Sequence, residues 1–447
     1  MRLRSWLATC SSSTCTTTTT TAASAAVPPS PKLLVSDASS FSDVPTSSST
    51  PSSSNSNTSS PSLQSNLSLQ TLPSVPSLQS LSPETLAVSY ACLTSLRPSL
   101  PHSPVTCVAV HQGLLYAASL NEINVYDRAT SSHLDTFNGR DSSSSSGSVK
   151  AVAFADGKVL TAHQDCKIRV WRMTSNKRCK LLTTLPTVND RLRRFVLPKN
   201  YVSVRRHKKR LWIQHADAVT GLAVNNGLIY SVSWDKTLKI WRASDLRCVE
   251  SVRAHEDAVN AVAVSADGTV YTGSADKRIR VWAKPEGEKR HALVATLEKH
   301  KSAVNALALN DDGSVLFSGS CDRSILVWER EDSANHMAVS GALRGHGRAI
   351  LCLSNVSDLL LSGSADRTVR IWRRGHEGRY CCLAVLDGHA KPVKSLAGSV
   401  TECGDYSDAN GVVTVFSGSL DGEAKVWQIS VSRPISTPII SSHNFVK

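Results

Sequence analysis

The sequence predicts an all-β fold built from small repeated sheets. The stretch Tyr271–Trp282 reads as a strand, a tight turn and a second strand that ends in Trp. The pattern occurs six times, with an Asp six residues before the Trp and a Ser or Thr four residues before the Asp. From Trp241 to Trp372, consecutive Trp residues of the pattern lie 41 to 46 residues apart. Repeats of this period indicate similar units that bury their apolar faces against one another.

This spacing of Ser or Thr, Asp and Trp resembles the WD40-repeat family, over residues 88 to 430. The resemblance implies a seven-bladed β-propeller in which each blade is a four-stranded antiparallel sheet. The order of the inserts also resembles that of plant JINGUBANG-type WD40 proteins. This second resemblance implies a plant regulatory protein of the cytosol and the nucleus.

Composition divides the chain into a tail (1–87), the propeller (88–430) and a C-terminal tail (431–447). Ser, Thr and Pro dominate the first tail, and no Gly occurs before Gly113. Such a stretch cannot bury enough apolar surface to offset its ordering entropy, so we expect it to be disordered. Its start, with no acidic residue before Asp37, also fits a plastid or mitochondrial transit peptide.

Two segments of this region have a more specific pattern. Residues 62–81 are rich in Leu, and Pro73 and Pro76 forbid a continuous helix. We expect an extended segment that docks onto a partner or onto the side of the propeller itself, with a solvated tail as the alternative. Tyr90–Leu96 reads as a strand, and we expect it outermost in the blade of Trp427, since closure of the ring removes a free sheet edge.

The first two repeats depart from the pattern. Tyr126 stands in the Trp position of blade 1, and blade 2 has Thr161, Asp165 and Trp171 but no His before its first strand. Blades 3 to 7 each begin at a His. We therefore expect blades 1 and 2 to be the looser part of the ring.

In the family, the His, the strand Ser or Thr, the turn Asp and the Trp form one hydrogen-bond chain. The chain satisfies a buried Asp, which would otherwise be costly, and it stabilises the blade only when it is complete. The resemblance implies five complete sets here: His215, Ser231, Asp235, Trp241; His255, Thr272, Asp276, Trp282; His300, Ser318, Asp322, Trp328; His346, Ser362, Asp366, Trp372; and His389, Ser417, Asp421, Trp427.

Catalysis is not expected from these residues. Ser, His and Asp recur in five equal copies, whereas an enzyme needs one site, and repetition of the fold explains every copy. The chain has no phosphate-binding loop, no His-Glu-x-x-His motif and no Cys-x-x-Cys pair, so we expect no cofactor and no metal site. The sequence contains no run of about 18 apolar residues, so we expect no membrane span.

The family pattern also predicts where partners bind. The residue before each turn Asp lies on the top face in this family, and in blade 3 this residue is Trp234. A Trp on a rigid rim is a common binding hot spot, although Trp234 could instead pack on the neighbouring blade or on the basic insertion. Arg348 and Lys391 follow their His residues on the same rim, opposite the acidic Asp217 and Asp257. This asymmetry would orient a partner.

An insertion at 186–214 separates blades 2 and 3 and carries +8 of the net charge of +14. Its cluster resembles a nuclear-localisation signal and consists of Arg205, Arg206, Lys208, Lys209 and Arg210. The insertion could serve nuclear import, bind an acidic protein or nucleic acid, or be a charged packed loop. Import or an acidic partner is favoured over DNA reading, because no recognition helix is visible.

Together these features favour a non-catalytic protein-interaction scaffold, expected as a monomeric propeller in the cytosol and nucleus. The alternative is an RNA- or DNA-binding module that uses the insertion 186–214.

Overall fold

The structure is a computed structural model, and it describes residues 75–79, 87–98, 103–139, 147–176, 178–205, 208–288, 290–330, 337–375, 378–401 and 411–432. Most of the predicted tails 1–87 and 431–447 lies outside these ranges, and so does Arg206 of the basic cluster.

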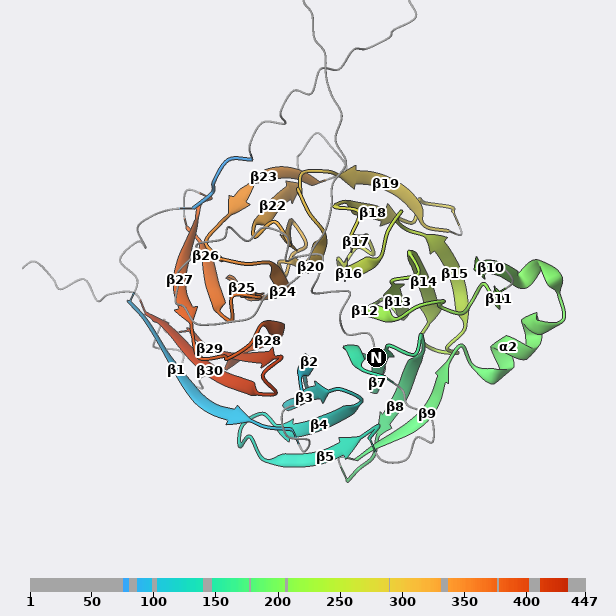
Figure 1. The fold of residues 1–447 in the computed structure, drawn as a ribbon, viewed down its shortest axis with the longest axis horizontal. Coiled ribbons are helices and arrows are strands. Elements are labelled where there is room, and N and C mark those ends of the chain that lie inside the picture. Colours follow the sequence, from blue (N-terminus) through green and yellow to red (C-terminus); the bar gives the residue numbers. More distant parts are fainter. Residues whose placement is uncertain are drawn as a thin grey trace, which may run out of the picture. The chain divides into compact units, whose positions relative to one another are not determined.

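The strands form seven four-stranded antiparallel sheets, which confirms the predicted all-β, seven-bladed propeller (Figure 1). Blade 1 consists of β2 (Val105–His111), β3 (Leu114–Ser119), β4 (Glu122–Asp127) and β5 (His133–Phe137). Blade 2 consists of β6 (Val149–Ala155), β7 (Lys158–His163), β8 (Ile168–Met173) and β9 (Cys179–Leu185). Blade 3 consists of β12 (Val219–Asn225), β13 (Leu228–Ser233), β14 (Thr237–Arg242) and β15 (Cys248–Arg253).

Blades 4 to 6 have their strands in the same sequence order, whereas blade 7 takes its fourth strand from the start of the propeller. Blade 4 consists of β16 (Val259–Val264), β17 (Val270–Ser274), β18 (Ile279–Ala283) and β19 (Ala292–Leu297). Blade 5 consists of β20 (Val304–Leu309), β21 (Val315–Ser320), β22 (Ile325–Arg330) and β23 (Met337–Leu343). Blade 6 consists of β24 (Ile350–Val356), β25 (Leu359–Ser364), β26 (Val369–Arg374) and β27 (Tyr380–Leu386). Blade 7 consists of β28 (Val393–Thr401), β29 (Gly411–Ser419), β30 (Ala424–Ser432) and β1 (Ala87–Leu96).

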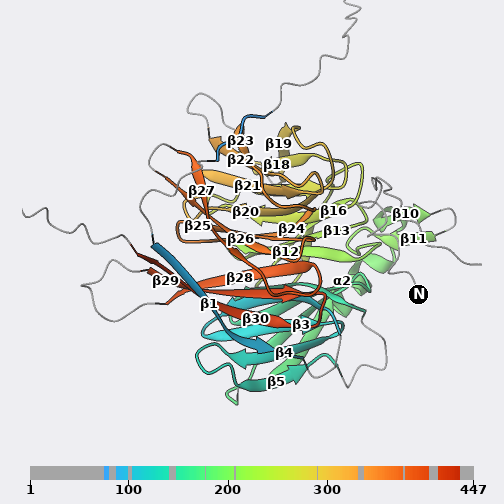
Figure 2. The ribbon, with the colours of Figure 1, turned by 60° about the vertical axis from the view of Figure 1, so that its left-hand side comes forward.

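The ring is closed by β1, the first strand among the described residues. β1 pairs antiparallel with β30, with Cys92 opposite Trp427, and is the outermost strand of blade 7. Figure 2 shows β1 running along the outside of this blade. The prediction made for Tyr90–Leu96 is therefore confirmed. The innermost strands contact one another from β2 through β6, β12, β16, β20 and β24 to β28, which contacts β2 again.

The core lies between the blades rather than inside any one of them. Buried apolar residues form one cluster at each junction of neighbouring blades, and the cluster at the closing junction joins Val105 and Leu115 of blade 1 to Phe416 of blade 7. Close approach at these junctions explains the Gly in the second strands. A Cβ on Gly319 would lie 2.5 Å from Ile350 of the next blade.

The insertion between blades 2 and 3 is folded and projects from the side of the ring (Figure 1). It contains the helix α2 (Val188–Phe195), a 3-10 turn η1 (Pro198–Asn200) and a hairpin of β10 (Tyr201–Arg205) and β11 (Lys208–Leu211). Thr187 caps α2, since its hydroxyl accepts the backbone N–H of Asp190 at 3.1 Å. Sequence reasoning did not predict this helix.

Part of the Leu-rich segment docks onto the propeller's own side. Residues Val75–Gln79 bridge to Ala342 of β23 and to Tyr380 of β27. For these residues, the docking alternative stated from the sequence is confirmed. Residues 62–74 and 80–81 lie outside the described ranges.

Candidate functional site

A buried hydrogen-bond chain crosses blade 3. His215 Nδ1 lies 3.0 Å from Asp235 Oδ2, and His215 Nε2 lies 2.8 Å from Ser231 Oγ. The indole N–H of Trp241 donates to Ser231 Oγ at 2.9 Å. With the indole donating to the hydroxyl, the consistent assignment has the Ser231 hydroxyl donating to Nε2 and the Nδ1–H of a neutral His215 donating to the carboxylate. The donors thus all point from Trp241 toward Asp235.

The structure brings the other four sets together in the same way. The His Nε2 to hydroxyl distance is 2.8 Å in each, the His Nδ1 to Asp distance is 2.8 or 2.9 Å, and the indole N–H donates over 2.8 to 3.0 Å. These sets are His255–Thr272–Asp276–Trp282, His300–Ser318–Asp322–Trp328, His346–Ser362–Asp366–Trp372 and His389–Ser417–Asp421–Trp427.

The environment of each turn Asp favours its charged form. Burial alone would raise the pKa of Asp276 and Asp421, but hydrogen bonds from His and from backbone amides lower each to about 2. The pKa values of Asp235, Asp322 and Asp366 are lowered in the same way. Burial lowers the pKa of His215 despite the nearby Asp235, which keeps the imidazole neutral.

Blade 2 has no His before its first strand, but another buried His takes its place, and sequence reasoning missed this residue. His163 of β7 is buried, and its Nε2 lies 2.7 Å from Thr161 Oγ1, which accepts the indole N–H of Trp171 at 2.9 Å. Asp165 pairs with Arg169 at 2.8 Å instead. Burial, aided by the charge of Arg169, lowers the pKa of His163 to about 3, so it is neutral. Blade 2 thus keeps most of the chain although its His comes from a strand.

The chemistry open to these residues is restricted by burial. The hydroxyl-bearing residues of the five sets, Ser231, Thr272, Ser318, Ser362 and Ser417, have no exposed surface. A nucleophile must reach its substrate, and these hydroxyls cannot. Burial also raises the pKa of the Cys107 thiol to about 11 and those of Cys248 and Cys352 to about 12, so these thiols are protonated.

The turns that contain the Asp residues form one rim. The N–H of Trp234, just before Asp235, donates to Ala218 O at 3.1 Å, and each regular blade repeats this bond to the loop that follows its His. Arg348 and Lys391 are exposed on this rim, and so are Asp217 and Asp257. Trp234 is half-buried, with Lys150 Nζ of β6 5.9 Å from its ring centroid.

Comparison with known proteins identifies the repeats. The WD domain, G-beta repeat model matches residues 207–242, 246–283, 291–329, 338–373 and 380–428. The chain carries WD40 repeats. The five matches cover blades 3 to 7, the same blades in which the structure has the complete His–Ser/Thr–Asp–Trp chain.

A stretch of the chain also resembles part of Pre-mRNA-processing factor 19 from Bos taurus, Mus musculus and Rattus norvegicus. Each of these proteins is 30% identical over 135 residues, which are 29% of this chain. The match spans about a quarter of the length of these relatives (26%).

The basic insertion is attached to the WD40 ring through one face of α2. Asp190 is buried, forms an ion pair with Arg194 and accepts the Cys248 N–H at 3.3 Å. The Arg194 guanidinium also lies 5.0 Å from the ring centroid of Trp212. The opposite face is apolar and exposed, because Leu192 and Phe195 are 63% and 64% exposed. Sequence reasoning missed this face because it did not predict the helix.

The basic cluster lies on the hairpin of the insertion. Arg205 ends β10, Lys208 begins β11, and Lys209 is exposed. Arg210 is half-buried and donates to the carbonyl of His215 at 2.9 Å. Within the cluster, Lys209 therefore faces solvent, whereas Arg210 fastens the hairpin to the loop that begins blade 3.

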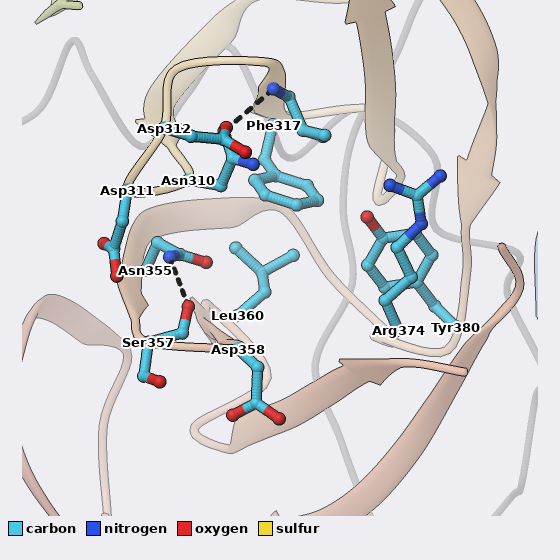
Figure 3. Close-up of a pocket in the computed structure, with 11 residues that line it drawn as sticks. Asn310, Asp311, Asp312, Phe317, Asn355, Ser357, Asp358, Leu360, Arg374 and Tyr380 are labelled. Atoms are coloured by element: carbon cyan, nitrogen blue, oxygen red, sulfur yellow. Dashed lines mark hydrogen bonds between the residues drawn. The ribbon is translucent and has the colours of Figure 1, made fainter. Parts of the chain in front are cut away.

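A pocket of about 340 Å³ lies between blades 5 and 6 (Figure 3). It is lined by Asn310, Asp311, Asp312, Val315, Phe317, Asn355, Ser357, Asp358, Leu360, Arg374 and Tyr380. In the described part of the chain, no three His, Cys, Asp or Glu side chains are grouped to hold a metal ion. Among the helices that the structure describes, none is long and apolar enough to span a membrane.

Removing one hydroxyl from a chain tests its contribution to stability. In Ser231→Ala, His215 Nε2 and the Trp241 N–H lose their shared partner in a buried site, so we expect a loss of about 1–2 kcal/mol in the free energy of unfolding. Urea denaturation measures this loss. Ser244→Ala, in the same blade but exposed, is the matched control, and equal stabilities for the two variants would contradict the role given to the chain.

The turn Asp residues also predict how stability depends on pH. Their folded pKa lies below the usual unfolded value of about 4, so folding favours the charged form. The resulting stabilisation is complete above pH 4 and is lost as the pH falls through about 2, the folded value for Asp276. We expect about 2 kcal/mol from Asp276.

Urea midpoints between pH 2 and 6 measure this dependence. Asp276→Asn should be less stable at neutral pH and should lose less stability on acidification than the parent chain. Parallel pH profiles for the two proteins would show that the Asp276 charge does not stabilise the fold.

Proposed function

We propose that the chain is a non-catalytic scaffold that binds partner proteins on the turn rim around Trp234. The observation that carries this proposal is the fixed geometry of the rim. In blades 3 to 7, a backbone hydrogen bond joins each Asp turn to the loop that follows the His. The buried His–Ser/Thr–Asp–Trp chain lies directly beneath each of these turns. A rigid rim loses little entropy on binding, and a partly exposed Trp adds a large contact area.

The charges on the rim support a preferred orientation of the partner. Arg348 and Lys391 are exposed on blades 6 and 7, whereas Asp217 and Asp257 are exposed on blades 3 and 4. A partner with the complementary pattern would be steered onto the rim in one orientation. This distribution favours a protein with mixed charge over a uniformly anionic polymer.

The insertion would provide a second contact or an import signal. Its net charge of +8 and its exposed apolar residues Leu192 and Phe195 fit an acidic protein segment that also carries apolar side chains. Use of the insertion for RNA or DNA is the alternative. Binding to phosphates would weaken steeply as the salt concentration rises, which distinguishes the two ligands.

The location and pathway also belong to this proposal. The chain's partial similarity to a pre-mRNA-processing factor supports a nuclear role, and the order of the inserts supports a plant regulatory protein shared between cytosol and nucleus. A plastid location remains the alternative if the Ser- and Thr-rich start of the chain is a transit peptide.

Substitution at the rim tests the scaffold directly. We expect Trp234→Ala to lose partners in a pull-down from the native tissue while its thermal unfolding stays close to that of the parent chain. Leu420→Ala, at the equivalent half-buried position in blade 7, is the matched control. A second variant, Leu192→Ser with Phe195→Ser, changes only exposed side chains of the insertion. Unchanged partners for both variants would exclude both surfaces.

Import has its own test. Replacing Lys208 and Lys209 by Gln in a fluorescent fusion should reduce the nuclear signal, because the cluster loses two of its charges. The control is Lys277→Gln with Lys284→Gln, at two exposed positions in blade 4, because this variant has the same net charge as the test variant. A nuclear fraction that is the same in both variants and in the parent would count against an import signal in the hairpin.

A further inference from the structure

The segment Val75–Gln79 is bound as an added strand across two blades. Ala342 of β23 donates its N–H to Pro76 O at 2.8 Å, and Leu78 donates back to Ala342 O at 3.1 Å. Tyr380 of β27 then donates to Leu78 O at 2.8 Å. Outer strands of propeller blades offer unpaired backbone groups, and an extended peptide that pairs with them uses the β-augmentation mode of recognition.

The propeller contacts the side chains of Val75–Gln79 as well as their backbone. Leu78 packs onto the apolar cluster between blades 5 and 6. It lies over Gly341, where a Cβ would overlap its side chain, so the missing side chain of Gly341 makes room for the Leu. Gln79 donates to the carbonyl of Arg344, and the Arg344 guanidinium donates to Val75 O at 2.9 Å.

The seated residues are repeated in the sequence. Pro76-Ser-Leu-Gln79 is followed by Ser80, and the identical pentapeptide stands at Pro61–Ser65. A third Ser-Leu-Gln occurs at Ser68–Gln70, with Leu67 in the place of the Pro. Residues 61–74 lie outside the described ranges. Their sequence nevertheless offers the groove the same backbone, the same Leu and the same Gln.

We propose that the groove over β23 and β27 is a recognition site for extended Pro-Ser-Leu-Gln peptides, and that Pro61–Ser65 and Pro76–Ser80 are interchangeable occupants. Both copies are tethered to the groove by the chain, so each has an effective concentration on the order of millimolar. A free peptide of the same sequence must compete with both. The site is independent of the turn rim and of the function proposed for it.

The test uses the full-length chain and a fluorescent peptide with the sequence of residues 59–67. Fluorescence anisotropy measures its binding to variants in which Leu63, Leu69 and Leu78 are replaced by Asp, which places a charge where the groove takes a Leu. The triple variant should bind the peptide. Variants that keep only Leu63 or only Leu78 should bind it at least tenfold more weakly, because one tethered copy refills the groove.

A control places the binding at the groove itself. The nearest neighbours that a Cβ on Gly341 would meet are Leu78 and Pro76 O, all atoms of the docked segment. Gly341→Val in the triple variant should therefore abolish peptide binding without lowering the thermal unfolding temperature. Binding that survives Gly341→Val, or a triple variant that does not bind, would overturn the site. Equal binding by the triple variant and the variant that keeps Leu63 would overturn the interchangeable occupant.

Discussion

Each blade buries its apolar faces only against its two neighbours, and the rest of the structure depends on this constraint. A ring that failed to close would expose two such faces and two sheet edges. Closure is achieved at blade 7, where β1 pairs with β30 and Leu96 packs in the same cluster as Val105 and Phe416. The first and last strands of the propeller therefore stabilise each other, although they lie more than 300 residues apart in the chain.

The polar chains extend this packing to the edges of the blades. A turn needs a carboxylate to accept its backbone N–H groups, and that carboxylate must then be partly buried beside apolar neighbours. His255 and Thr272 solve this for Asp276 by connecting it to the indole of Trp282. These hydrogen bonds tie each turn to the core of its blade, which restrains the surface that the turns make.

Periodic features of the fold could be predicted from the sequence, and features that depend on one tertiary contact could not. The Asp-to-Trp spacing repeats, so it located strands and turns of blades 2 to 7, and the degenerate repeat with Tyr126 in the Trp position, together with the family resemblance, gave the seventh blade. His163 escaped notice because it reaches Thr161 from within the strand rather than from the preceding loop. Helix α2 was missed because it has eight residues and is held by contacts of Asp190 and Arg194 with Cys248.

The same property of sheet edges explains both the closure of the ring and the docking of the Leu-rich segment. An outer strand has one row of backbone groups without a partner in its own blade, and whichever extended segment is tethered nearby can pair with it. At β30 the partner is β1, fixed by nine residue pairs. At β23 and β27 the partner is only a few residues long, held by three backbone bonds. A short strand pairing is easier to replace than a long one. The docked peptide segment can therefore be exchanged at blades 5 and 6, whereas β1 closes blade 7 permanently.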